Sequence, residues 1–169
     1  MALKGFILDC VTREPIAYNE PANLFASLAT RKHMPALWTG FLRMIQLAST
    51  DDGALSDIVP SLPGSRRQSD VSQTAGYPML VWYLHRCLDD RRLLEQHEPS
   101  VRAWVDFIGR ELADESHIVK KGWLGEHMLP GREVGQWEFR STETPPPFIW
   151  TCPYQHNVAT VHTDLGLLP

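Results

Sequence analysis

The sequence lacks any long hydrophobic run. No stretch approaches the roughly 20 consecutive apolar residues that a membrane-spanning helix needs, so we expect no transmembrane segment. Its first residues also lack the apolar stretch and the small-residue cleavage site of a secretory signal peptide. From the sequence alone we therefore expect a cytoplasmic protein.

Basic tracts and cysteines are also scarce. The chain has 16 Lys and Arg against 20 Asp and Glu, a formal net charge of −4, and no basic cluster of the kind that binds nucleic acid. The three cysteines, Cys10, Cys87 and Cys152, are odd in number and far apart, so they form neither a disulfide framework nor a metal-binding pattern. We expect no cofactor, no metal ion, and neither nucleic acid nor a membrane as a partner.

What the sequence does contain is helical spacing of apolar residues. Its 169 residues suit a single domain over 1–169. Apolar side chains recur three and four positions apart in several segments, which predicts an all-α fold of about five helices joined as antiparallel hairpins with long loops. The expected helices cover residues 22–32, 35–48, 77–88, 99–112 and about 150–165, the last ended by Gly166.

Turn residues mark the breaks between these helices. Asp89 and Asp90 should end the third helix and start a new apolar turn, after which Pro99 should begin the fourth helix. Residues 49–75 are rich in turn residues and lack helical spacing, so they predict a long loop, which in a compact domain is usually functional or disordered. The proline triplet at 145–147 suits a stiff linker or a polyproline-recognition segment.

Residues 9–14, with the sequence Asp-Cys-Val-Thr-Arg-Glu, form the first site-like stretch. Asp9 directly follows an apolar run, and two later prolines, Pro15 and Pro21, disfavour a continuous helix. A carboxylate at the edge of a core can have a raised pKa and act as an acid near neutral pH. The alternative from these residues alone is an Asp9–Arg13 ion pair and an exposed Glu14 in an ordinary loop.

Residues 122–131, Gly-Trp-Leu-Gly-Glu-His-Met-Leu-Pro-Gly, form the second site-like stretch. Glu126 and His127 could act as a charge-relay pair or as half of a metal site. Adjacent loop residues generally point apart, and no third ligand has a diagnostic spacing. The commoner explanation for a single histidine is a satisfied surface or core residue.

The Asp-Cys-x-x-Arg-Glu string followed by Tyr18 resembles the catalytic loop of the bacterial α-L-rhamnosidase family of inverting glycoside hydrolases. By this resemblance, Glu14 matches the general acid that protonates the leaving sugar oxygen. Asp9 matches a carboxylate that holds the rhamnose hydroxyls. Tyr18 matches the aromatic residue that lines the sugar pocket, and Arg13 is assigned to substrate binding with them.

The resemblance has departures within the same loop. Val11 replaces the usual proline, and Pro21 stands where the family has a second sugar-binding aspartate. Glu20, one residue earlier, is the candidate to take over part of that contact. The loop at residues 63–73 has no tryptophan, whereas the family usually places one there in the sugar site.

Three later segments also resemble the family in the expected order. Residues 52–60 match an Asp-Gly string that leads to the pocket rim, and residues 143–149 match the lead-in to the next helix. Residues 122–131 match a loop whose Asp-Trp pair faces the substrate, so Glu126 and His127 are implied to contact the sugar.

The family architecture is an (α/α)6 toroid, a ring of six helical hairpins. The resemblance therefore implies that this chain forms a partial (α/α)6 toroid, the six-hairpin glycosidase-like fold. The family's general base is a glutamate in the later part of the ring, to which nothing here corresponds. An open half-ring would expose apolar helix faces, so self-association is expected.

Three functions follow as hypotheses. The first is a fragment of an α-L-rhamnosidase-like glycoside hydrolase, which acts on rhamnose-containing glycosides or polysaccharides with inversion when complete. The second is an inactive remnant that serves as a carbohydrate-binding or helical interaction module. The third is a helical scaffold with no ligand, which would leave both site-like stretches unexplained.

Overall fold

The structure is a computed structural model that describes residues 2–3, 6–7, 35–60, 69–122 and 144–163. The expected helix at 22–32 lies outside these residues. The first two described segments are short strands, β1 (Ala2–Leu3) and β2 (Phe6–Ile7), which pair antiparallel with Ala2 opposite Ile7. β2 contacts the first long helix, α2 (Pro35–Leu47), so the last described residues before the stretch 9–14 lie next to the helices.

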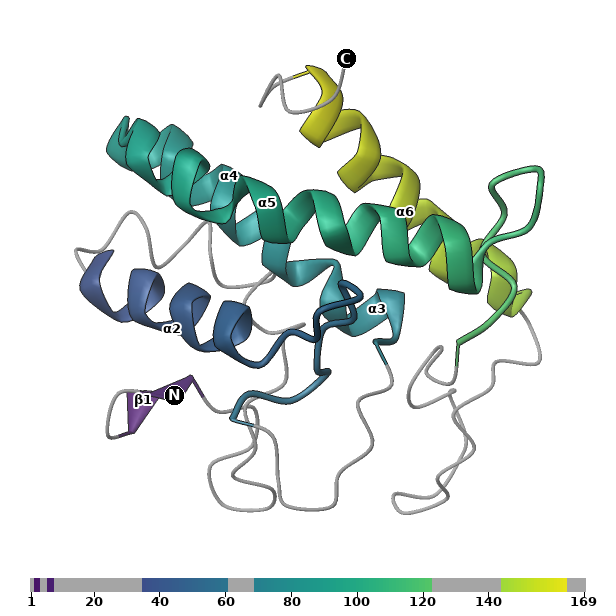
Figure 1. Ribbon diagram of the computed structural model, residues 1–169, viewed down its shortest axis with the longest axis horizontal. Coiled ribbons are helices and arrows are strands. Elements are labelled where there is room, and N and C mark those ends of the chain that lie inside the picture. The colour runs from purple at the N-terminus through teal and green to yellow at the C-terminus, as the bar shows by residue number, and fades with distance from the viewer. Residues whose placement is uncertain (1, 4–5, 8–34, 61–68, 123–143, 164–169) are drawn as a thin grey trace.

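Helices make up the rest of the regular structure in the described residues, as the all-α prediction requires. In Figure 1, α4 and α5 run side by side as an antiparallel hairpin, α2 lies on one side of them, and α6 crosses behind toward the C-terminus. The elements are α2 (Pro35–Leu47), α3 (Val71–Thr74), α4 (Gly76–Leu88), α5 (Arg91–Phe107), the π-helix η2 (Ile108–Leu112) and α6 (Pro146–Thr163).

α2 begins at Pro35, as predicted, because the first helical position needs no backbone N–H and favours the fixed φ of proline. Apolar residues at helical spacing turn one face of α2 toward α4. The buried residues of this face are Trp38, Phe41, Leu42 and Ile45.

The turn between α4 and α5 also forms where the sequence predicts it. Asp89 adopts the left-handed conformation, with φ of 50°, and its N–H donates to the His85 carbonyl at 2.8 Å. The Asp90 carboxylate then caps α5 by accepting from the Arg92 backbone N–H at 3.0 Å. These two adjacent caps reverse the chain within two residues and set up the antiparallel hairpin.

The prediction that Pro99 begins a helix is wrong, because α5 already starts at Arg91 and Pro99 lies in its interior. A proline there removes one hydrogen bond, the one to the carbonyl of Glu95. Pro99 and Glu95 are both exposed, so water can satisfy that carbonyl. Burial of Leu93, Val101 and Trp104 on the opposite face holds the helix together across the proline.

The predicted loop over 49–75 is wrong at its end, where α3 forms a single helical turn. The Asp70 carboxylate accepts from the backbone N–H of Ser72 at 2.9 Å and from its hydroxyl at 2.6 Å. The Asp70 carbonyl also accepts from the Thr74 N–H at 2.8 Å. A buried cap thus starts a helix in a sequence that has no helical spacing.

The proline triplet opens a helix instead of forming a polyproline segment. Pro146 and Pro147 occupy the first turn of α6, and the Pro145 carbonyl accepts from the Phe148 N–H at 2.9 Å. The first turn tolerates proline because its N–H groups have no partner within the helix. α6 therefore starts four residues before Trp150, and the predicted end at Gly166 lies outside the described residues.

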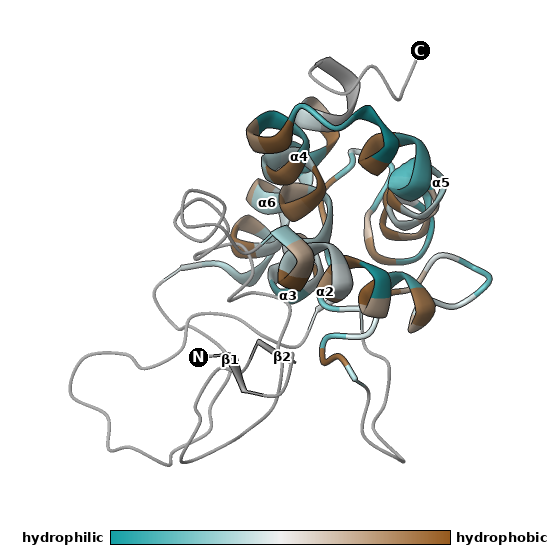
Figure 2. Cartoon of the chain, turned by 90° about the vertical axis from the view of Figure 1, so that its left-hand side faces the viewer, coloured by the Kyte–Doolittle hydropathy of each residue, from teal (hydrophilic) through white to brown (hydrophobic). Residues whose placement is uncertain are grey.

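The core lies between these helices. Figure 2 shows hydrophobic residues concentrated where α2, α4, α5 and α6 face one another. Among the described residues, no helix is long and apolar enough to cross a membrane. The largest fully buried side chains include Trp104, Tyr77, Phe41, Leu42, Ile45, Leu55, Leu80, Leu84, Ile108 and His97.

Candidate functional site

The seven predicted site residues all lie outside the described residues, so their mutual geometry stays a prediction. What the structure describes is the framework on either side of the two site-like stretches. β2 ends two residues before the first stretch, and the second stretch starts at Gly122, the last described residue before the gap. The predicted site residues are Asp9, Arg13, Glu14, Tyr18, Glu20, Glu126 and His127.

A buried polar cluster joins the loop after α2 to α3. The Asp57 carboxylate accepts from the Asp70 N–H at 2.8 Å, and the Ser69 hydroxyl accepts from the Leu55 N–H at 3.0 Å. Asp57 is 4% exposed and Asp70 is fully buried. The cluster ties residues 55–57 to residues 69–70, and the sequence between them contains part of the loop that the resemblance assigns to the pocket.

α5 is tied to the same region through Trp104. Its indole N–H donates to the Thr74 hydroxyl at 3.0 Å, and that hydroxyl donates to the Asp70 carbonyl at 2.8 Å. All three residues are fully buried. Trp104 lies within the helix expected over residues 99–112, but the sequence gave no role to Asp70 or Thr74, because both fall inside a segment with no helical spacing.

The Asp-Gly turn of residues 52–60 packs directly on α5. Gly53 has φ of +95°, and a Cβ atom at this position would lie 2.2 Å from the Ala103 carbonyl oxygen. The Thr50 hydroxyl donates to the Asp52 carboxylate, and this bond, with one from the Ala54 N–H, lowers the Asp52 pKa. The glycine that the family string contains is therefore required here by contact with a neighbouring helix.

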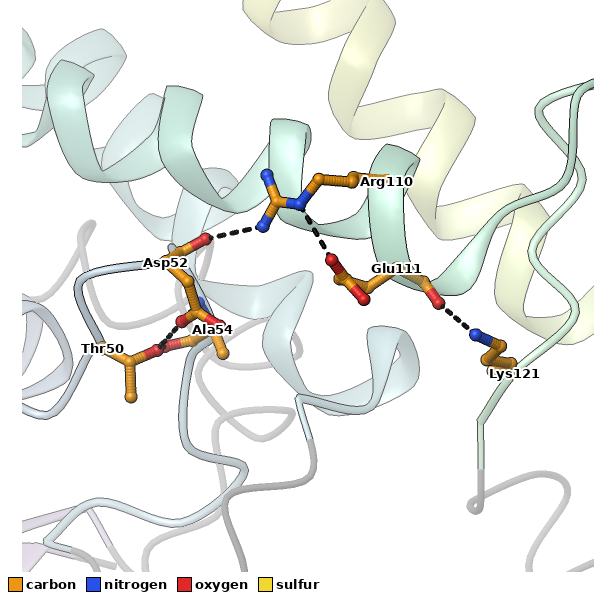
Figure 3. Close-up of polar contacts among 6 residues, drawn as sticks. All are labelled: Thr50, Asp52, Ala54, Arg110, Glu111 and Lys121. Atoms are coloured by element: carbon orange, nitrogen blue, oxygen red, sulfur yellow. Dashed lines mark hydrogen bonds and ion pairs between the residues drawn. The ribbon is translucent and has the colours of Figure 1, made fainter.

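A surface contact joins this turn to the end of α5 (Figure 3). The Arg110 guanidinium donates to the Asp52 carbonyl at 3.2 Å and to the Glu111 carboxylate at 2.9 Å. Lys121 donates to the Glu111 carbonyl at 2.8 Å, so residues 120–122 are tied to the same point. Arg110 and Glu111 both belong to the π-helix η2, which directly follows α5.

Gly122 leads directly into the second site-like stretch and is pressed against α6. A Cβ atom at Gly122 would lie 2.4 Å from the nearest ring atom of Trp150. Nearby, the Val119 N–H donates to the Thr151 hydroxyl at 3.0 Å. The start of the loop that carries Glu126 and His127 is thus held at the N-terminal part of α6.

Metal-binding geometry is not found in the described part of the chain, where no group of three or more His, Cys, Asp or Glu side chains is placed to hold an ion. The two cysteines described there, Cys87 and Cys152, are free thiols at exposed positions. What the framework provides is a set of anchored ends for loops rich in carboxylate and aromatic residues.

The α4–α5 antiparallel hairpin, with α2, α3 and α6 packed around it, places the described chain among the α/α-hairpin proteins. The model of the bacterial α-L-rhamnosidase six-hairpin glycosidase domain matches residues 1–163. The chain therefore belongs to this family, and its fold is that of the six-hairpin glycosidases.

Individual relatives agree with this assignment. An α-L-rhamnosidase of Streptomyces avermitilis is 28% identical over 157 residues. The solved structure of α-L-rhamnosidase from Dictyoglumus thermophilum superposes with a TM-score of 0.77 at 24% identity and covers 97% of this chain. A structure of the Streptomyces avermitilis α-L-rhamnosidase complexed with L-rhamnose gives a TM-score of 0.66 at 24% identity and covers 90% of this chain.

The chain is much shorter than these relatives. It spans 14% of the length of the curated Streptomyces protein and 18% of the Dictyoglumus chain. The match therefore shows the family and the fold of this segment.

Proposed function

We propose that this chain is part of a glycoside hydrolase that removes terminal α-L-rhamnose with inversion, and that Glu14 is its general acid. The observation that carries the proposal is the family match over residues 1–163, which contains the Asp-Cys-x-x-Arg-Glu string at residues 9–14. One matching relative has a structure described as a complex with L-rhamnose, which supports rhamnose-containing glycosides as the substrate class.

Hydrolysis of a glycoside with inversion requires two carboxyl groups. An inverting glycosidase uses one protonated carboxylic acid to protonate the leaving oxygen and a second carboxylate to activate water from the opposite face of the sugar. The two groups stand about 6.5–9.5 Å apart to leave room for that water. Glu14 is proposed for the first role, and the base is proposed to be a residue that this chain does not contain.

The remaining site residues are proposed to bind the sugar. Asp9 and Arg13 would hold hydroxyl groups through charge-assisted hydrogen bonds, and Tyr18 would supply an aromatic wall. Glu20, Glu126 and His127 complete the proposed set of sugar contacts. The anchored framework supports this role because it fixes Gly122, from which the loop with Glu126 and His127 departs.

The assignment of Glu14 is tested in the longest product of the gene that contains this chain. Glu14→Gln keeps the shape of the side chain but removes the acid, so hydrolysis of a rhamnoside with a poor leaving group should fall by about 10²–10⁴-fold. A rhamnoside with an activated aryl leaving group should lose much less, because that leaving group needs little protonation. The rates of both substrates are measured for each variant.

The matched control is Glu95→Gln. Glu95 is 67% exposed on α5 and pairs only loosely with Arg91 at 3.6 Å, so both rates should stay at the wild-type level. If Glu14→Gln leaves the rate on the poor leaving group unchanged, Glu14 is not the acid.

A second candidate function is sugar binding without turnover. The replacement of the family's second sugar-binding aspartate by Pro21 favours it. This alternative predicts heat on calorimetric titration with L-rhamnose together with no hydrolysis by the gene product. Hydrolysis that depends on Glu14 rejects it.

A further inference from the structure

A line of five polar side chains runs from the surface of α2 into the core between α4 and α5. The line is Arg43, Gln46, Ser100, Tyr77 and His97, and we refer to it as the polar relay. Tyr77 is fully buried and His97 is 1% exposed. Polar groups this deep in an apolar core must satisfy one another, so the direction of each hydrogen bond can be worked out.

The direction is fixed at the surface end. Arg43 can only donate, and its guanidinium lies 2.7 Å from the Gln46 side-chain oxygen. The Gln46 amide nitrogen donates to the Gln96 backbone carbonyl at 3.0 Å, an atom that can only accept. The amide therefore has one possible orientation, and its nitrogen also donates to the Ser100 hydroxyl at 3.1 Å.

The same direction continues into the core. Because the Ser100 oxygen accepts from Gln46, its own proton is available for Tyr77, and a hydrogen bond from Ser100 acts to lower the Tyr77 pKa against the larger opposing effect of burial. The Tyr77 hydroxyl lies 2.8 Å from Nδ1 of His97. A neutral imidazole with its proton on Nε2 can accept the Tyr77 proton at Nδ1, and this tautomer continues the direction set at the surface end.

The charges around His97 oppose a second proton. From α2 the positive charge of Arg43 acts on the imidazole, and from α4 the titratable neighbour is the Tyr77 hydroxyl, which presents a proton. On α5 itself, Glu98 is paired with Arg102 at 2.7 Å. A proton added to Nδ1 would meet the Tyr77 proton and force the relay to reverse or break.

We propose that the Tyr77–His97 pair is an acid-sensitive switch, which holds α5 against α2 and α4 at neutral pH and releases it when Nδ1 of His97 takes up a proton. The relay supplies the geometry, because the bonds from Arg43 to Gln46 and from Gln46 to Ser100 both donate inward, and the Tyr77 hydroxyl lies 2.8 Å from Nδ1 of His97. The pair joins α4 to α5 across the hairpin, and Gln46 joins α2 to α5, so one protonation affects three elements.

The sign of the pH dependence follows from the environment of His97. Burial, with a smaller effect of Arg43, lowers its pKa from the ordinary 6.5 to about 4. The unfolded chain therefore binds a proton at His97 between pH 6.5 and about 4 that the folded chain does not bind. Folded stability from this residue is fully present above pH 6.5 and is lost as the pH falls through this window.

The direct test is nitrogen NMR of the chain labelled with ¹⁵N-histidine. His97 should show a proton on Nε2 and a hydrogen-bonded, unprotonated Nδ1 from pH 7.5 down to pH 5. Its signal, assigned by its loss in His97→Asn, should change only together with loss of the folded signals below that pH. A proton on Nδ1 at pH 7, or protonation near pH 6.5 with the fold unchanged, would overturn the proposal.

The second test compares unfolding of three proteins in urea between pH 7.5 and pH 4.5. The side-chain oxygen of His97→Asn can accept from Tyr77 but does not titrate. Below pH 6 the ratio of folded to unfolded protein should therefore fall more steeply in the wild type than in His97→Asn. The difference should reach up to about tenfold per pH unit. His117→Asn is the matched control, because His117 is exposed and its positive φ of 58° suits asparagine. Equal pH dependence in wild type and His97→Asn would contradict the switch, and if His97→Asn does not fold, His97→Gln replaces it in both tests.

Discussion

At the scale of single residues, Gly53 and Gly40 differ in whether the structure has room for an added methyl group. Gly53 has positive φ and its α-hydrogen faces the Ala103 carbonyl, so an added methyl group would collide with backbone. Gly40 lies exposed inside α2 with nothing within 4 Å of an added Cβ. The same chemical change should therefore destabilise the protein at one site and stabilise it at the other.

We predict that Gly53→Ala lowers the free energy of unfolding by about 2 kcal/mol or more, since it combines a strained backbone with a steric clash. Gly40→Ala should raise it by about 0.5–1 kcal/mol, because alanine is the better helix former. Urea unfolding of both variants followed by circular dichroism checks this. A neutral Gly53→Ala would mean that the turn does not pack on α5 as described.

At the scale of elements, α5 is joined to α3 by the hydrogen bond from Trp104 to Thr74. Trp104→Phe removes the donor and Thr74→Val removes the acceptor, and each leaves a buried polar group without this partner. We predict a cost of about 1–3 kcal/mol for each single change. In a double-mutant cycle measured by urea unfolding, the double variant should cost about 1 kcal/mol less than the sum. Strict additivity would contradict the bond.

Elements bounded by local signals could be predicted from the sequence, and elements bounded by tertiary contacts could not. Pro35 and the Asp89–Asp90 turn are set by neighbouring residues, so their positions were predicted correctly. Pro99 was assigned to a helix start because proline is common there. It is tolerated inside α5 because it is exposed to solvent, and that exposure depends on how the helix packs. The turn of α3 depends on a buried Asp70, and burial is not visible in a short polar string.

The candidate site also has parts that could be predicted from the sequence and parts that could not. The two site-like stretches were identified from strings of residues, and the roles of their site residues stay predictions because those residues lie outside the described part of the chain. The polar relay was missed because Tyr77 and His97 are 20 positions apart, and only the α4–α5 packing brings them together. Sequence spacing shows which residues share a helix face, but it does not show which side chains meet across two helices.

At the scale of the whole molecule, the described residues form one antiparallel hairpin, α4–α5, with α2, α3 and α6 packed around it. The helical core fixes residues 57 and 70 on either side of one loop and Gly122 at the start of another. Rigid ends and variable loops are the usual way in which a scaffold positions reacting groups. This arrangement agrees with the proposal that residues in these loops bind and cleave the sugar.

The central claim is that these loops belong to an inverting α-L-rhamnosidase. The most direct measurement is proton NMR of the sugar that the gene product releases from an aryl α-L-rhamnoside, recorded before the anomers equilibrate. The account predicts that β-L-rhamnose appears first and that the α-anomer follows only by mutarotation. Initial release of α-L-rhamnose would contradict inversion, and no release by the folded gene product would contradict the hydrolase assignment itself.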